Sequence, residues 1–278
     1  MTNMIRAVAL ALSTLMMTAA GLAAERVALV IGNSAYERNR LNNPGNDARA
    51  VAAEFQRLGF KVIERHDLDK AGFDDAVAEF ISALEDTDIA AFYYAGHGNQ
   101  FPRDDLTYDN YLIPVRSNIT VLSQAKFKFV SVSDIQDAMA GSARRSLMFI
   151  DACRNNLLDD PALAVRGLRG ATPLQGFANL HARRRNAENL ISYATSFGDF
   201  AADGESANSP YTTALLKHLS RKGATIESIL KDVRRDVRAL TGNRQDPAYV
   251  SDLVSDVILN PEPPAGTAVV ARADTGPA

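Results

Sequence analysis

Short apolar runs alternate with stretches of helical periodicity along most of the chain. We expect buried strands at 26–32, 60–64, 89–95, 146–150 and 189–194. Apolar residues recur three or four positions apart, which predicts helices, at 48–58, 73–84, 133–140, 211–219 and 225–240. Strands that alternate with helices form mostly parallel sheets. The pattern therefore predicts an α/β fold whose open sheet carries helices on both faces.

The two ends of the chain differ from this middle part. Residues 1–24 hold a positive amino terminus, an uncharged apolar run and the small residues Gly21, Ala23 and Ala24, which is the pattern of a signal peptide. We therefore expect an exported protein, periplasmic or secreted; a retained membrane anchor is the alternative. The tail 261–278 contains four prolines and is predicted to be disordered. One domain, 25–260, lies between them.

Composition limits the classes of partner. The net charge of −3 and the short basic run at 183–185 give no reason to expect nucleic-acid binding. Beyond residue 24 no stretch is long and apolar enough to span a bilayer, so stable membrane insertion after signal removal is not expected. The sequence leaves the oligomeric state open.

The single cysteine, Cys153, cannot form a disulfide within the chain. It is either an inert buried thiol or a reactive one, and its surroundings favour the second. Cys153 follows one predicted strand, and His97 follows another, between Gly96 and Gly98. In open parallel sheets, ligands bind beyond the carboxyl ends of the strands. A histidine there can activate a thiol, so His97 and Cys153 form a plausible catalytic dyad.

These residues lie in motifs that resemble those of the caspase-like cysteine peptidases. Tyr93-Tyr-Ala-Gly-His-Gly98 resembles the family's histidine motif, and Phe149-Ile-Asp-Ala-Cys-Arg154 resembles its cysteine motif, at close to the interval of about 50 residues known for caspases. Weaker matches in the same order are 27–33, 41–47, 111–114, 191–195 and 208–212. The chain is most similar to bacterial relatives of metacaspases, the orthocaspases. The resemblance implies a caspase-like sheet of about six strands, with a large-subunit-like part (25–160), a loop (154–187) and a small-subunit-like part (188–260).

The resemblance also implies site residues. Gly98 and Cys153 would supply the N–H groups of the oxyanion hole. Asp47 and Asp151 match the family's acids of the S1 pocket, and Asp203 and Asp199 are weaker candidates for its wall. Carboxylates favour a cationic side chain, so we expect cleavage of protein or peptide substrates after Arg or Lys. From its position alone, Asp47 could instead be a helix N-cap, and Asp151 a strand-end turn residue.

The resemblance raises the question of calcium, and the arginine-rich composition of the loop suggests self-processing. Many metacaspases need calcium, and Asp104, Asp105 and Asp109 form an oxygen-rich cluster that could bind it. Arg116, however, stands where related proteins carry an acid. The sequence therefore requires no cofactor, and it leaves calcium binding open. Arg166, Arg169 and 183–185 offer basic sites for self-processing within the loop.

Two competing classes of function remain. A catalytically silent caspase-fold module would bind or regulate a partner, but such modules usually lose a dyad residue and this chain keeps both. A nucleotide- or flavin-binding protein is disfavoured because neither Gly-x-Gly-x-x-Gly nor a Walker A motif is present. A cysteine endopeptidase is the main prediction.

Overall fold

The structure is a computed structural model, and the residues described are 25–85, 87–102, 108–119, 121–153, 188–196, 201, 203–204 and 206–262. The predicted signal peptide (1–24), the basic loop from Arg154 to residue 187 and the tail after residue 262 lie outside the described residues.

The strands and helices alternate as the sequence predicts. The strands are β1 (Arg26–Gly32), β2 (Lys61–His66), β3 (Thr87–Pro102), β4 (Tyr108–Leu112), β5 (Val130–Ser131), β6 (Ala143–Cys153), β7 (Glu188–Tyr193) and β8 (Ala248–Ser251). The helices are α2 (Pro44–Arg57), α3 (Lys70–Ser82), α4 (Ala125–Lys128), α5 (Val132–Ser142), α6 (Pro210–His218) and α7 (Ile226–Leu240), with a 3-10 turn at Leu122–Gln124.

Six strands form one continuous path, in the order β2-β1-β3-β6-β7-β8. The first five pair in parallel, and β8 pairs antiparallel with β7 at the edge. Beyond its parallel section, β3 continues and pairs antiparallel with β4, which in turn pairs with β5. The predicted α/β fold, with an open and mostly parallel sheet of about six strands in its main path, is therefore confirmed.

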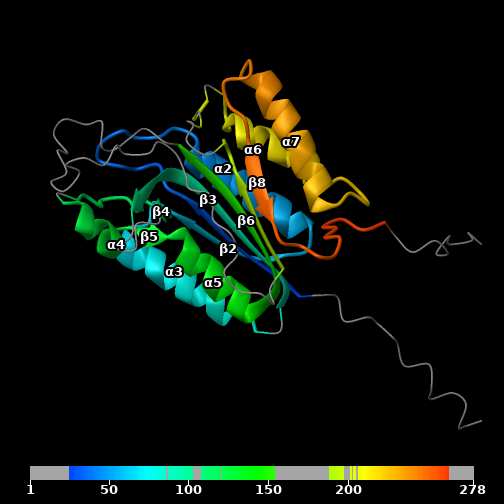
Figure 1. Ribbon diagram of the computed structural model, residues 1–278, viewed down its shortest axis with the longest axis horizontal. Helices are drawn as coiled ribbons and strands as arrows, with labels where there is room; N and C mark the ends of the chain where they lie inside the picture. The colour runs from blue at the N-terminus through cyan, green and yellow to red at the C-terminus, as the bar shows by residue number, and fades with distance from the viewer. Residues whose placement is uncertain are drawn as a thin grey trace, which may run out of the picture.

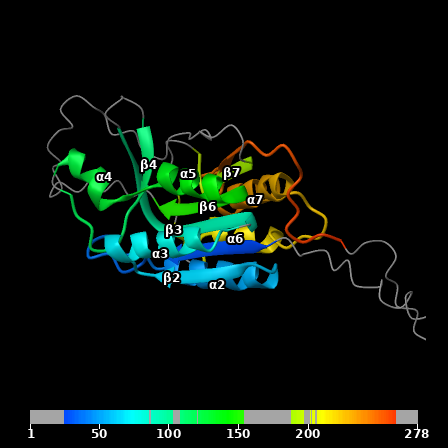
Figure 2. The same cartoon turned by 90° about the horizontal axis from the view of Figure 1, so that it is seen from below.

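Helices cover both faces of this sheet, which is why its central strands are apolar on both sides. Figure 1 shows α2, α6 and α7 on one face and α3 and α5 on the other. Figures 1 and 2 both place β4 and α4 at one end of the molecule, away from the ends of the described chain. The carboxyl end of β3 leads to that end, because β4 pairs with its last residues. In the described parts of the chain no helix has the length and apolarity needed to cross a membrane.

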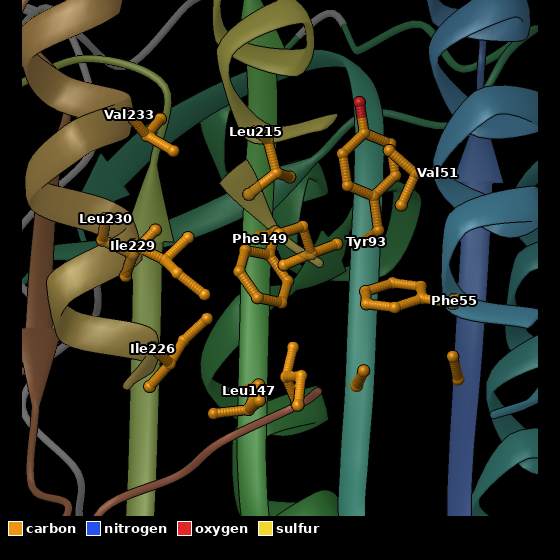
Figure 3. Packing of buried hydrophobic residues seen from close by; sticks show 14 of the residues in the cluster. Val51, Phe55, Tyr93, Leu147, Phe149, Leu215, Ile226, Ile229, Leu230 and Val233 are labelled. Carbon is orange, nitrogen blue, oxygen red and sulfur yellow. The ribbon is translucent and has the colours of Figure 1, made fainter. Parts of the chain in front are cut away.

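One face of the sheet is closed by aromatic and aliphatic packing. Figure 3 shows Tyr93 of β3 and Phe149 of β6 pointing toward Phe55 of α2 and Leu215 of α6. The rings of Phe55 and Phe149 lie 6.0 Å apart, and both side chains are fully buried. This packing holds α2 and α6 against the two strands that carry His97 and Cys153.

Helix α2 corrects one interpretation of Asp47. The helix begins at Pro44, a residue suited to a first helical turn because it lacks an N–H, and Asn43 occupies the N-cap position. Asp47 lies inside the first turn and is buried, so it is not the N-cap. Its carboxylate is therefore available for contacts with other parts of the fold.

The strand ends differ from the predicted ones in a way that matters for the site. Gly96, His97 and Gly98 were expected to follow a strand that ends near Ala95, but β3 runs on through them to Pro102. The two short partners β4 and β5 and the edge strand β8 had not been predicted. His97 thus lies within a hydrogen-bonded strand, and its backbone has neighbours on both sides.

Candidate active site

The pairing of β3 with β6 makes His97 and Cys153 neighbours. The register pairs Ala95 with Asp151, Gly96 with Ala152 and His97 with Cys153. Adjacent strands lie about 4.8 Å apart, so these two residues, distant in sequence, meet near the carboxyl end of β6. Cys153 is the last residue of β6, and its side chain lies outside the description.

The imidazole of His97 is buried and held by a backbone carbonyl. Its Nε2 lies 2.6 Å from the carbonyl oxygen of Asn39, which can only accept, so Nε2 carries the hydrogen. In the neutral ring Nδ1 then holds the lone pair that can take a proton. The ring also packs on Tyr36, with ring centroids 4.3 Å apart. Asn39 adopts a positive φ of 53°, which asparagine tolerates better than most residues.

Gly98 lies opposite Leu112 in the antiparallel pair of β3 and β4. The N–H of Ile113 donates to the carbonyl of His97 at 2.9 Å, which makes the Gly98–Leu112 pair a non-hydrogen-bonded one. The N–H of Gly98 consequently faces away from β4, toward the side of β3 on which β6 lies. This direction is compatible with the oxyanion role expected of Gly98, which stays a prediction.

Two buried aspartates belong to the same region: Asp151 lies on β6, two residues before Cys153, and Asp47 lies on α2. Asp47 Oδ1 accepts from the side-chain amide of Asn208 at 2.8 Å and from the N–H of Ser209 at 3.1 Å. Asp151 Oδ2 accepts from the hydroxyls of Ser209 and Thr212, the latter at 2.8 Å. Ser209 thus bridges the two carboxylates, one through its N–H and the other through its hydroxyl.

The second oxygen of Asp151 is different. Oδ1 is buried and finds no hydrogen-bond partner among the described residues. A buried acceptor of this kind is costly unless a ligand or water meets it. The side chain therefore offers an unused acceptor in a site whose other oxygen is fully engaged.

Burial dominates the electrostatics of this acid pair. Removal from water raises the pKa of Asp47, and the negative charge of Asp151 raises it further. Burial also raises the pKa of Asp151, against the lowering effect of the Ser209 and Thr212 hydroxyls. Asp203 adds repulsion to both. Each carboxylate would be more stable beside a cation than alone.

Asp203 has partners of its own. Its two carboxylate oxygens accept from the N–H groups of Asn42 and Asn43, at 2.8 and 3.3 Å, and its carbonyl accepts from the Asn43 side chain. These bonds join the segment before α6 to the start of α2. The other candidate for the pocket wall, Asp199, lies outside the described residues.

The structure describes one of the three calcium candidates. Asp109 is fully buried on β4, and its carboxylate accepts from the hydroxyls of Ser131 and Ser133 at 2.8 and 2.6 Å. It thereby joins β4 to β5 and α5. Asp104 and Asp105 lie outside the described residues, so the calcium site stays a prediction. Within the described part of the chain, no three His, Cys, Asp or Glu side chains are grouped as metal ligands would be.

An open α/β sheet in which a histidine of one central strand pairs with the last residue of the next, a cysteine, has the architecture of a caspase-like cysteine peptidase. A model of the caspase-domain family matches residues 25–258, and the chain belongs to this family. Protein GSU0716 of Geobacter sulfurreducens, a solved structure, is similar in fold, with a TM-score of 0.63 and 20% identity over 86% of this chain and 98% of that one. No curated protein gives a significant match.

Several residues of the site were not foreseen from the sequence. Tyr36 and Asn39 contact His97 from the loop after β1, a segment with no periodicity to mark it. Ser209 and Thr212 belong to a motif used only as a family marker. Ser209 is also the N-cap of α6, bonded to the N–H of Thr212 at 2.9 Å, and a cap signal could have located it.

Proposed function

We propose that the protein is a cysteine endopeptidase that hydrolyses peptide bonds after Arg or Lys, with Cys153 as nucleophile and His97 as its proton acceptor and donor. The observation that carries the proposal is the juxtaposition of two features at one sheet edge. The first is the register that pairs His97 with Cys153, and the second is the buried acid pair of Asp47 and Asp151.

The proposed reaction is acyl transfer through the thiol. The His97 imidazole takes the proton of Cys153, and the thiolate attacks the scissile carbonyl carbon. The tetrahedral oxyanion would accept from the N–H groups of Gly98 and Cys153. His97 then protonates the leaving amine, and a water molecule hydrolyses the thioester, which restores the thiol and releases the carboxylate product.

The Nε2–H bond to the Asn39 carbonyl supports this role for His97. It fixes the tautomer that leaves Nδ1 as the basic nitrogen, and it restrains rotation of the ring. A main-chain carbonyl also stabilises the imidazolium that forms when the thiol loses its proton, because the imidazolium is the stronger donor.

The acid pair supports a cationic P1 side chain. Two neighbouring buried carboxylates repel each other, and a guanidinium or ammonium between them would relieve that repulsion. The unused Oδ1 of Asp151 is a ready acceptor for such a group. Arginine, with a planar set of donors, would be bound more strongly than lysine. Asp203 adds negative charge nearby, although its carboxylate already holds the start of α2.

Peptide cleavage tests the proposal. Fluorogenic peptides ending in Arg, Lys or Asp are incubated with the reduced protein, with and without calcium, beside Cys153→Ala. Cleavage after Arg or Lys that is lost in Cys153→Ala is the expected result. Cleavage after Asp would support peptidase activity but refute the assignment of Asp47 and Asp151 to the S1 pocket. No cleavage under any of these conditions would favour a catalytically silent binding module.

We also propose self-processing at Arg166, Arg169 or 183–185. The support is their basic character, which matches the proposed P1 preference. On a denaturing gel the unmutated protein should give two fragments that Cys153→Ala does not give. Equal integrity of the two proteins would refute this step.

A further inference from the structure

Two buried tyrosine hydroxyls meet beside His97. Tyr36 comes from the loop after β1, and Tyr94 comes from β3, three positions before the histidine. Their hydroxyl oxygens lie 3.1 Å apart. Both also reach the carbonyl oxygen of Ile113, at 3.0 Å from Tyr36 and 3.1 Å from Tyr94.

The same hydroxyls hold the main chain of His97 on both sides. The N–H of His97 donates to the Tyr36 hydroxyl at 2.9 Å, and the Tyr94 hydroxyl donates to the carbonyl of His97 at 2.9 Å. Because that carbonyl also accepts from the N–H of Ile113, the peptide groups before and after His97 are both engaged.

We propose that Tyr36 and Tyr94 form a hydroxyl clamp that positions His97 for proton transfer, so that both are positioning residues of the reaction. The inference rests on the proposed peptidase function and adds two residues that neither belong to the dyad nor touch the acid pair. Tyr36 acts twice, since its hydroxyl holds the His97 backbone while its ring packs on the imidazole.

Gly96 provides the space for the clamp. A Cβ at this position would lie 2.5 Å from the Tyr94 hydroxyl oxygen and 2.7 Å from that of Tyr36. Both distances are far below van der Waals contact, and the buried tyrosines cannot swing into solvent. A glycine next to the histidine is therefore required by two hydroxyls of the same chain.

The clamp also ties His97 to the loop that orients its ring. Tyr36 and Asn39 belong to the same short segment, and the Asn39 carbonyl binds Nε2. If the Tyr36 hydroxyl is lost, the His97 N–H loses its acceptor and the segment loses its bond to Ile113. The imidazole would then sample other orientations, and displacements of about 1 Å can lower a rate by about a hundredfold.

Tyrosine-to-phenylalanine variants test the clamp, because only a hydroxyl is removed. Tyr36→Phe and Tyr94→Phe should each lower kcat for an Arg peptide by about tenfold or more while KM changes less than about twofold. Rates are expressed per active site, titrated with an irreversible thiol inhibitor, so that loss of folded protein does not count. Tyr193→Phe is the matched control, since it removes another buried hydroxyl, bonded to Asn110.

Nitrogen NMR of His97, assigned with His97→Ala, gives a second measurement that needs no peptide cleavage. The unmutated protein should show separate signals for a protonated Nε2 and a lone-pair Nδ1, and the clamp variants should show averaging of the two. If the unmutated protein cleaves no peptide, the function fails while this measurement still tests the clamp. Unchanged NMR signals, or a kcat per site equal to that of Tyr193→Phe, would overturn the clamp.

Discussion

Replacing Asp151 by Asn should strongly lower cleavage after basic residues and at the same time stabilise the fold. The Ser209 and Thr212 hydroxyls both donate to Oδ2, so the amide oxygen must take that place. The amide NH₂ then occupies the position of Oδ1, which is buried and has no partner in the described part of the chain. A donor would face the substrate cation where an acceptor is proposed.

The two effects have different magnitudes. Loss of one partner from a buried charge pair costs about 2–5 kcal/mol, so kcat/KM for Arg peptides should fall by about 30-fold to about 5,000-fold. For stability, burial raises the pKa of Asp151 from 3.8 to about 6, a difference equivalent to about 3 kcal/mol at most. A gain of about 2 kcal/mol corresponds to a Tm about 4–8 °C higher.

The pH dependence follows from the sign of this shift. A carboxyl whose pKa is raised on folding opposes folding only when it is ionised. The loss of unfolding free energy due to Asp151 is therefore absent below pH 3.8, grows up to about pH 6 and is complete above that pH. The Tm of Asp151→Asn should therefore exceed that of the unmutated protein at about pH 8 and match it at about pH 4.

Thermal unfolding at these two pH values and peptide cleavage on the same samples measure both effects. Asp74→Asn is the matched control, because it makes the same change in charge at an exposed helix position paired with Lys70. Such an exposed pair contributes about 0–1 kcal/mol. A variant whose kcat/KM for Arg peptides falls by less than about 30-fold, or one that is less stable than the unmutated protein at about pH 8, would refute the reasoning.

Four further outcomes are expected. Ser209→Ala removes a hydroxyl that donates to Asp151 and also caps α6. It should lower the free energy of unfolding by about 1 kcal/mol, measured with urea, and move the pH profile of Arg-peptide cleavage to higher pH. Binding of argininamide should release protons from the protein, because a cation lowers the raised pKa values of Asp47 and Asp151. Calorimetry in buffers of different ionisation enthalpy measures this release, and the affinity for argininamide should rise with pH. Asp203→Asn should lower kcat, because the carboxylate that holds the start of α2 is lost, and a fall in the ratio of Arg to Asp cleavage would support Asp203 as a residue of the pocket wall; an unchanged kcat would contradict this prediction. Phe149→Ala should cost about 3–5 kcal/mol in urea unfolding, because the ring is fully buried between β6 and α2.

The order of strands and helices could be predicted because each element carries a local signal. β1 is apolar at five consecutive positions that the structure buries completely, from Val27 to Ile31, as a central parallel strand requires. α7 is amphipathic over its whole length, with Thr225 as an N-cap that accepts from Ser228. These signals depend only on near neighbours in the chain.

The elements that were missed depend on distant partners. β8 has only half-buried residues and becomes a strand because β7 offers it an edge. β3 continues past Ala95 because β4 pairs with its second half. The need for glycine at position 96 likewise comes from distant partners, because the Tyr36 and Tyr94 hydroxyls approach its backbone. No local pattern encodes such contacts.

One stretch of chain before and within α2 joins the parts of the site that sequence alone leaves separate. Tyr36 and Asn39 contact His97, Asn43 binds Asp203, and Asp47 accepts from Ser209. A cation that draws the acid pair together would therefore act on the same segment that orients the imidazole. The geometry of the histidine and the occupation of the pocket are linked through about a dozen residues, which is why specificity and rate should respond together to changes in this segment.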